Sequence, residues 1–86
     1  MKKFLIIYSS ENTAPIISRI KTFGNWVHIK NRVWCISTNL TSAIEVRDCF
    51  QNVINNPEQL MVIDITYSNW AAINIPMDAV CWLKEN

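Results

Sequence analysis

The sequence predicts an α+β domain in which one β-sheet packs against helices. Two short, apolar runs rich in β-branched and aromatic residues indicate strands: KFLIIY at 3–8, expected to be a central strand buried on both faces, and LMVIDIT at 60–66. A third apolar stretch, 25–38, indicates a hairpin, and two segments with helical periodicity alternate with these runs. The chain has 86 residues, half of them apolar, so we expect a single domain over residues 1–86.

A helix is expected directly after the first strand. Asn12 or Thr13 can cap its start, and Gly24 lies where a helix would end. Between these points the apolar residues recur at helical spacing, at Ile16, Ile17, Ile20 and Phe23.

The hairpin over 25–38 has its turn around Lys30 to Arg32. Its first arm resembles an edge strand, while the second arm, VWCI, has the composition of a central strand. A second helix is expected in TSAIEVRDCFQNVI, 41–54, where Ser42 and Glu45 have the spacing of a capping box. After the last strand, the stretch from Pro76 to Lys84 indicates a short helix.

This order of elements predicts a ferredoxin-like split βαββαβ sandwich with a C-terminal extension or short helix. Right-handed crossovers place both main helices on one face of such a sheet and leave the other face bare. Because the central strands are apolar at successive positions, the bare face needs a cover. The C-terminal tail, a second copy of the chain, or both can supply it. We therefore expect a homodimer packed through its sheets, with candidate interface residues Tyr8, Trp70 and Trp82.

Composition narrows the function classes. The net charge is near +1, and the cations are interleaved with acids, so no dense basic stripe for nucleic acid is present. The apolar run after the two N-terminal lysines is shorter than a signal-peptide core, and no stretch is long enough to span a membrane. Three widely spaced cysteines indicate small apolar core residues rather than a metal or redox site. These features predict a soluble cytoplasmic protein without a cofactor.

The hairpin carries the most suggestive polar group. Trp26 and Trp34 lie on facing arms, and Lys30 and Arg32 lie at the turn. His28 lies on the first arm, between Trp26 and Lys30. Aromatic side chains interleaved with cations can stack on bases and contact phosphates, which makes these five residues candidate nucleic-acid contacts. The alternative is a cross-strand packing pair beside a solvated edge-strand histidine.

Several strings resemble a known group of proteins: GNWVHIKNRVWCISTNL at 24–40, EVRD at 45–48, NW at 69–70 and CWLKEN at 81–86. They are similar to short bacterial proteins labelled SinR-like. Those proteins in turn resemble the small dimeric CRISPR-associated proteins known as metal-dependent endoribonucleases and as the scaffold of the spacer-integration complex. The resemblance covers nearly the whole chain, and it implies the same fold and a dimer.

In that nuclease family the first strand ends in Tyr-Asp, and the paired aspartates of a dimer hold the metal ion. Here Tyr8 matches the tyrosine but is followed by Ser9, whose neutral hydroxyl is a poor ligand for a hard divalent cation. Glu11 and Asp64 are the acids that could substitute, although a surface or structural role is the simpler interpretation of both.

We therefore expect a noncatalytic homodimeric binding protein that contacts protein or, weakly, nucleic acid, without catalytic or metal-binding residues. One alternative is a divergent metal-dependent endoribonuclease. Another is a small accessory or inhibitor protein of a mobile element or defence system.

Overall fold

The computed structural model describes residues 1–86 and contains four strands and three helices. In chain order they are β1 (Lys2–Ser9), α1 (Ala14–Lys21), β2 (Trp26–Lys30), β3 (Val33–Thr38), α2 (Ala43–Asp48), β4 (Gln59–Asp64) and α3 (Met77–Glu85). The predicted hairpin, both predicted helices and the C-terminal helix are therefore present. None of the three helices is both long enough and apolar enough to cross a membrane.

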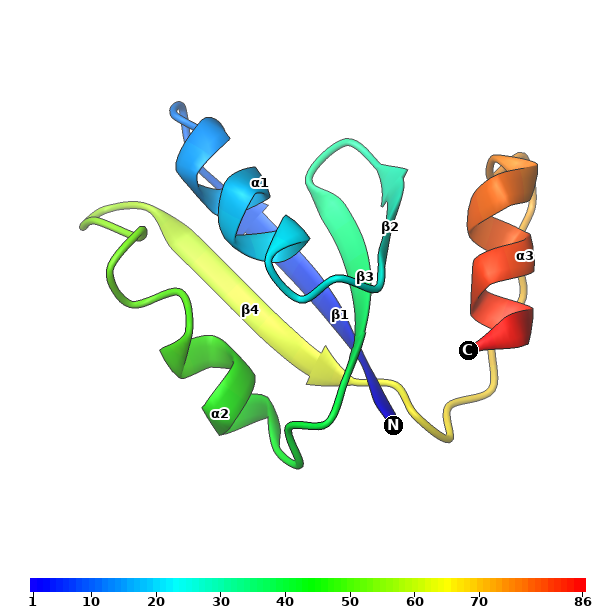
Figure 1. The fold of residues 1–86 in the computed structure, drawn as a ribbon. Coiled ribbons are helices and arrows are strands. Elements are labelled where there is room, and N and C mark those ends of the chain that lie inside the picture. Colours follow the sequence, from blue (N-terminus) through cyan, green and yellow to red (C-terminus); the bar gives the residue numbers. More distant parts are fainter.

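The strands form one antiparallel sheet in the order β2-β3-β1-β4 (Figure 1). β1 lies in the middle, opposite β3 on one side and β4 on the other. The strands β2 and β4 form the two edges, as expected for β2 from its polar alternation. Because β1 and β4 run antiparallel, the end of β1 at Ser9 lies beside the start of β4 at Gln59.

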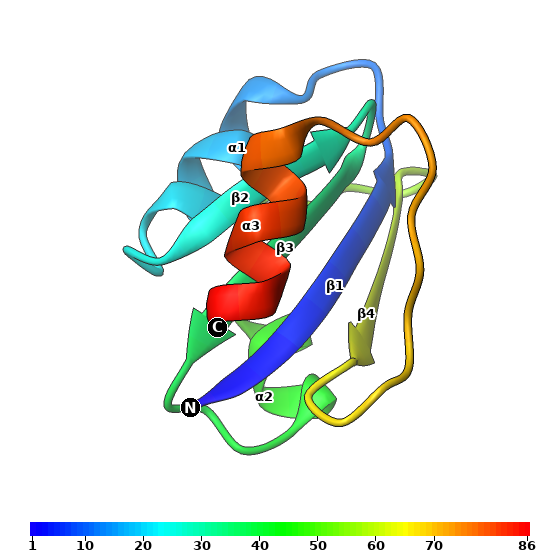
Figure 2. The same ribbon diagram turned by 90° about the vertical axis from the view of Figure 1, so that its right-hand side faces the viewer.

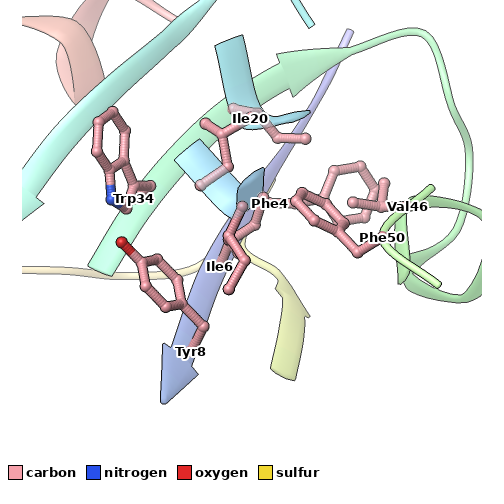
Figure 3. Packing of buried hydrophobic residues seen from close by; sticks show 9 residues of the cluster. Phe4, Ile6, Tyr8, Ile20, Trp34, Val46 and Phe50 are labelled. Carbon is pink, nitrogen blue, oxygen red and sulfur yellow. The ribbon is translucent and has the colours of Figure 1, made fainter. Parts of the chain in front are cut away.

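Helices α1 and α2 cover the same face of the sheet and enclose the main core (Figure 1). The apolar residues of β1 and β3 that point to this face meet those of the two helices, as Figure 3 shows. The core comprises Phe4, Ile6, Tyr8, Ile16, Ile20, Trp34, Ile36, Val46 and Phe50. Burying each large apolar side chain stabilises the fold by about 1.5 to 3 kcal/mol.

Helix α3 lies on the opposite face, in front of the half of the sheet formed by β2 and β3 (Figure 2). Ala79 and Leu83 of α3 pack against Val27 of β2 and Cys35 of β3, and these four residues form a second, smaller core. The C-terminal tail thus covers part of the second face of the sheet. The half formed by β1 and β4 has no helix over it.

Helix α2 is shorter than its sequence pattern predicts, because the α-helix ends at Asp48. From there the backbone continues in turns whose amides bond to the carbonyl three residues back, as in Phe50 to Arg47. These tighter turns still place Phe50 in the main core. Apolar spacing therefore predicted the buried face correctly but not the type of turn.

Candidate functional site

A groove of about 750 Å³ lies where the end of β1, the start of β4 and the chain after α2 meet. Its walls include the apolar side chains Phe50, Ile54, Leu60 and Met61, and its polar lining includes Ser9, Arg47, Gln51 and Glu58. A smaller hollow of about 280 Å³ continues along α2 and β4, and it shares Arg47, Leu60 and Met61 with the first. The open edge of β4 is therefore bordered on the α2 side by a partly apolar groove.

Glu58 supplies an acidic group beside the end of β1, next to Ser9 and Ser10. Its carboxylate accepts hydrogen bonds from the Ser10 hydroxyl and from the backbone N–H of Asn55, the latter at 2.7 Å. Ser10 also accepts a bond from the Asn12 amide at 3.1 Å. The hydrogen bond from Ser10, followed by the one from Asn55, lowers the pKa of Glu58 below its ordinary value. The carboxylate is thus held ionised within a local network.

Sequence reasoning considered other acids and missed Glu58. The signal lies in the strand pairing, because β1 pairs antiparallel with β4 and this brings the residue before β4 to the end of β1. Glu58 directly precedes β4 in the chain. Counting residues from the strand end along the sequence points instead to Glu11, which is exposed in the following loop.

Asp64 lies at the other end of β4, opposite Phe4, so it is far along the sheet from Ser9. Its carboxylate accepts bonds from the hydroxyl and the amide of Thr66 and forms a 3.2 Å ion pair with Lys2. These contacts, with the Thr66 hydroxyl first, lower the pKa of Asp64. No group of three or more His, Cys, Asp or Glu side chains comes together anywhere in the chain as a set of metal ligands.

In the hairpin, the rings of His28 and Trp26 pack against the buried ring of Trp34. The His28 imidazole stacks on the Trp34 indole with 4.3 Å between ring centroids, and Trp26 lies at 5.6 Å from the same indole. Trp34 is only 5% exposed, whereas His28 is exposed and its Nε2 lies 2.7 Å from the Asn31 carbonyl. Trp34 therefore supports the surface from below, and only the outer rings face solvent.

Three cations lie on or near the hairpin, but only Lys21 is placed beside a ring, because the irregular register after His28 sets Lys30 opposite Val33, on the face of the sheet that Cys35 occupies. The Lys21 ammonium lies 5.0 Å from the Trp26 ring centroid, and Lys30 and Arg32 are exposed at the hairpin turn. The two ion pairs of the chain involve Lys2 and Arg47, so these three cations have no acidic partner. We call Lys21, Trp26, His28, Lys30 and Arg32 the hairpin surface.

The three predicted interface residues lie in three different environments. Tyr8 is buried in the main core, beside Trp34 (Figure 3). Trp82 packs on the second core, and its indole N–H donates a 2.8 Å bond to Asn25. Trp70, in the chain between β4 and α3, is partly exposed.

The uncovered half of the second face carries apolar side chains that sequence reasoning did not single out. Met61 is 59% exposed and Ile63 is 40% exposed, and they lie opposite Ile7 and Leu5 of β1. We call Ile7, Met61 and Ile63 the open strip. Alternation along a strand predicts that these residues share a face, but not that α3 stops short of them.

The three cysteines are all free. Cys35 is fully buried under α3, and burial raises the pKa of its thiol to about 12. Cys49 is half-buried and Cys81 is exposed. The sequence interpretation of the cysteines as small apolar core residues is therefore correct for Cys35 but wrong for Cys81, which lies on the exposed side of α3.

Comparisons with protein-family models, with curated proteins and with solved structures each found no match to this chain.

Proposed function

We propose that this chain is a noncatalytic, homodimeric binding protein with a ferredoxin-like split βαββαβ fold. The fold assignment is supported by the order β1-α1-β2-β3-α2-β4, by the antiparallel sheet order and by the packing of α1 and α2 on one face. A cytoplasmic location belongs to the proposal and is supported by three free cysteines.

The open strip is the observation that carries the proposal. An isolated exposed apolar residue is ordinary, but Met61 and Ile63 are adjacent on one strand face and continue into Ile7. They border the second core, so α3 covers only the β2–β3 half of this face and leaves these side chains uncovered. Apolar side chains in such a position favour association with another protein surface, and a second copy supplies a matching strip.

The state of the acidic groups supports a noncatalytic function. Glu58 and Asp64 are each held by two or more hydrogen bonds from neighbouring groups, which is typical of structural carboxylates. Ser9 contributes only a hydroxyl at the strand end. A general acid or base needs a pKa near the working pH, whereas the pKa values of Glu58 and Asp64 are lowered away from it.

Weak contact with single-stranded nucleic acid is a second candidate function, favoured by the hairpin surface. The outer face of the His28 ring is available for a base to extend the stack on Trp34. Lys30 and Arg32, which have no acidic partner, can contact phosphates at the turn. The cations are few, so binding should be weak and should decrease with salt by a shallow slope, which reflects few phosphate contacts.

Two measurements on the purified chain test the proposal. Sedimentation at a few tens of micromolar should give a dimer, and a monomer would contradict the proposed dimer. Incubation with labelled single-stranded RNA and double-stranded DNA, with magnesium or manganese and with chelator, reads cleavage and gel shift together. Metal-dependent cleavage abolished by chelator and by Glu58→Gln or Asp64→Asn would contradict the noncatalytic function.

A further inference from the structure

The outer edge of β4 carries backbone groups that nothing in the chain uses. The Ile65 amide donates a 2.9 Å bond to the Lys3 carbonyl, which fixes the direction of the ladder between β4 and β1. Because hydrogen-bonding direction alternates along a strand, Met61 and Ile63 bond to β1. Leu60, Val62 and Asp64 then point their N–H and C=O groups away from the sheet, and no hydrogen bond of the chain reaches them.

The two edges of the sheet differ in how they are protected against further strands. The β2 edge carries Lys30 and an irregular register between His28 and Lys30, both of which discourage pairing. The β4 edge has no proline, lysine or bulge, and its one charge, Asp64, is engaged by Lys2. The chain leaving β4 passes to the side of the sheet on which α3 lies (Figure 1), and it runs along the β4 side of that face before it reaches α3 (Figure 2). An unprotected edge beside exposed Met61 is a template for another strand.

We propose that β4 pairs antiparallel with β4 of a second copy, about a two-fold axis at Val62, so that the two sheets become continuous. This inference rests on the homodimer proposed above and specifies its interface. A two-fold axis perpendicular to the sheet keeps each face on its own side, so residues facing the same side must lie opposite each other. Val62 then pairs with the partner's Val62, and Leu60 pairs with the partner's Asp64.

Each of these pairs exchanges two hydrogen bonds, because their N–H and C=O groups all point outward. Between them, Met61 lies opposite the partner's Ile63 on the open strip, as a close, non-hydrogen-bonded apolar pair. The pairing thus uses every outward backbone group of the strand and brings its most exposed apolar side chains into contact.

A neighbouring symmetric register, with the axis at Met61, fits less well. With Met61 on the axis, Leu60 pairs with the partner's Val62, and Glu58 lies opposite the partner's Asp64. The carboxylates of Glu58 and Asp64 are both ionised, and like charges directly opposite each other destabilise a strand pair. This register also leaves the outward groups of Asp64 without a hydrogen-bonded partner within the strand.

A strand of a different protein would find little charge to recognise on β4, whereas a second copy is complementary by symmetry. The groove along α2, lined by Ile44, Leu60 and Val62, adds apolar surface on the other side of the same edge. We therefore commit to a second copy as the occupant.

Disulfide cross-linking tests this register. In a Cys49→Ser/Cys81→Ser background, which retains the buried Cys35, Met61→Cys and Ile63→Cys chains are prepared separately and mixed under mild oxidation. Non-hydrogen-bonded pairs have Cα atoms about 4.5 Å apart, within reach of a disulfide. We expect a covalent dimer from the mixture and little from either variant alone. Cross-linking of Met61→Cys alone would place Met61 on the axis and overturn the register.

A backbone variant tests the edge itself. Val62→Pro removes an N–H that points away from the sheet, so the fold should be kept while the dimer dissociates. The matched variant Met61→Pro removes an N–H that bonds to β1 and should unfold the chain. Circular dichroism and sedimentation report the two effects separately. A folded Val62→Pro chain that remains dimeric would overturn β4 pairing but not the proposed dimer, and so would a dimer that does not form the mixed cross-link. A monomeric parent chain would contradict both the pairing and the dimer.

Discussion

The imidazole of His28 lies on the indole of Trp34, with 4.3 Å between the ring centroids and 20° between the ring planes. One ring faces solvent and the other is buried, so the two residues should contribute very differently to stability. Trp34→Ala should lower the free energy of unfolding by about 3 to 5 kcal/mol through loss of core packing. His28→Ala should lower it by less than about 1 kcal/mol. Urea unfolding measures both, and equal losses would contradict the layered arrangement.

Charge reversal on the hairpin surface should weaken any nucleic-acid binding. Lys30→Glu and Arg32→Glu place acids where unpaired cations now lie at the hairpin turn, so the gel shift of single-stranded RNA should be lost in both variants. Lys84→Glu changes the net charge equally but lies on α3, and it serves as the control. A loss of equal size in Lys84→Glu would indicate general electrostatic attraction rather than a site.

The hydrogen bond from Ser10 to Glu58 should make stability depend on pH. Because the folded pKa of Glu58 lies below its ordinary value of 4.5, the stabilisation is complete above about pH 4.5. It is lost as the pH falls through the folded pKa. Ser10→Ala should therefore lower the melting temperature most near neutral pH, with a smaller difference in acid. Melting curves from pH 3 to 7 test this, and a difference that grows toward low pH would contradict the sign.

Glu11→Gln is the matched control for this pH dependence, since Glu11 lies in the adjacent loop and accepts no hydrogen bond in the structure. It should leave the melting curve nearly unchanged at each pH.

Helix α3 should protect Cys35 from chemical labelling. Leu83 packs over Cys35 in the second core, and burial raises the pKa of this thiol to about 12. Leu83→Ala should destabilise the chain by about 2 to 5 kcal/mol and accelerate the labelling of Cys35 by a thiol reagent. The Cys49→Ser/Cys81→Ser background isolates this signal. Labelling that is already fast with Leu83 in place would show that α3 is not docked.

The cap of α2 gives a smaller, local prediction. The Ser42 hydroxyl accepts a 3.1 Å hydrogen bond from the backbone N–H of Glu45, as the capping-box spacing predicted. Ser42→Ala should cost about 1 kcal/mol of unfolding free energy, while Ser42→Asp should keep most of it. Equal losses in the two variants would mean that the cap bond contributes little.

Local patterns predicted the elements well because each depends on neighbouring residues. The hairpin turn near Lys30, the cap at Ser42 and the amphipathic face of α1 all follow from spacing within a few positions. The residues of the site depend instead on which strands pair. The bond between Ser10 and Glu58 joins residues far apart in the chain, and it becomes visible only when β4 is placed beside β1.

Burial was the other property that spacing did not determine. Alternation predicted that Trp26, His28 and Lys30 share one side of their strand. This is correct for Trp26 and His28, which both lie beside Trp34, but wrong for Lys30, because the irregular register after His28 sets Lys30 opposite Val33 on the other face. Alternation did not show that α1 and β1 would enclose Trp34 while leaving His28 exposed. Likewise, the apolar second face was predicted, but the reach of α3 over it depends on where a helix of nine residues ends.

The central claim is that this chain associates with itself through the outer edge of β4, beside the open strip. Sedimentation velocity at a few tens of micromolar, on the parent chain and on Val62→Pro, tests it most directly. We expect the parent chain to sediment at twice the 10.0 kDa of one chain and the folded Val62→Pro variant to sediment as a monomer. A parent chain that sediments as a single 10.0 kDa species across this range would contradict the claim.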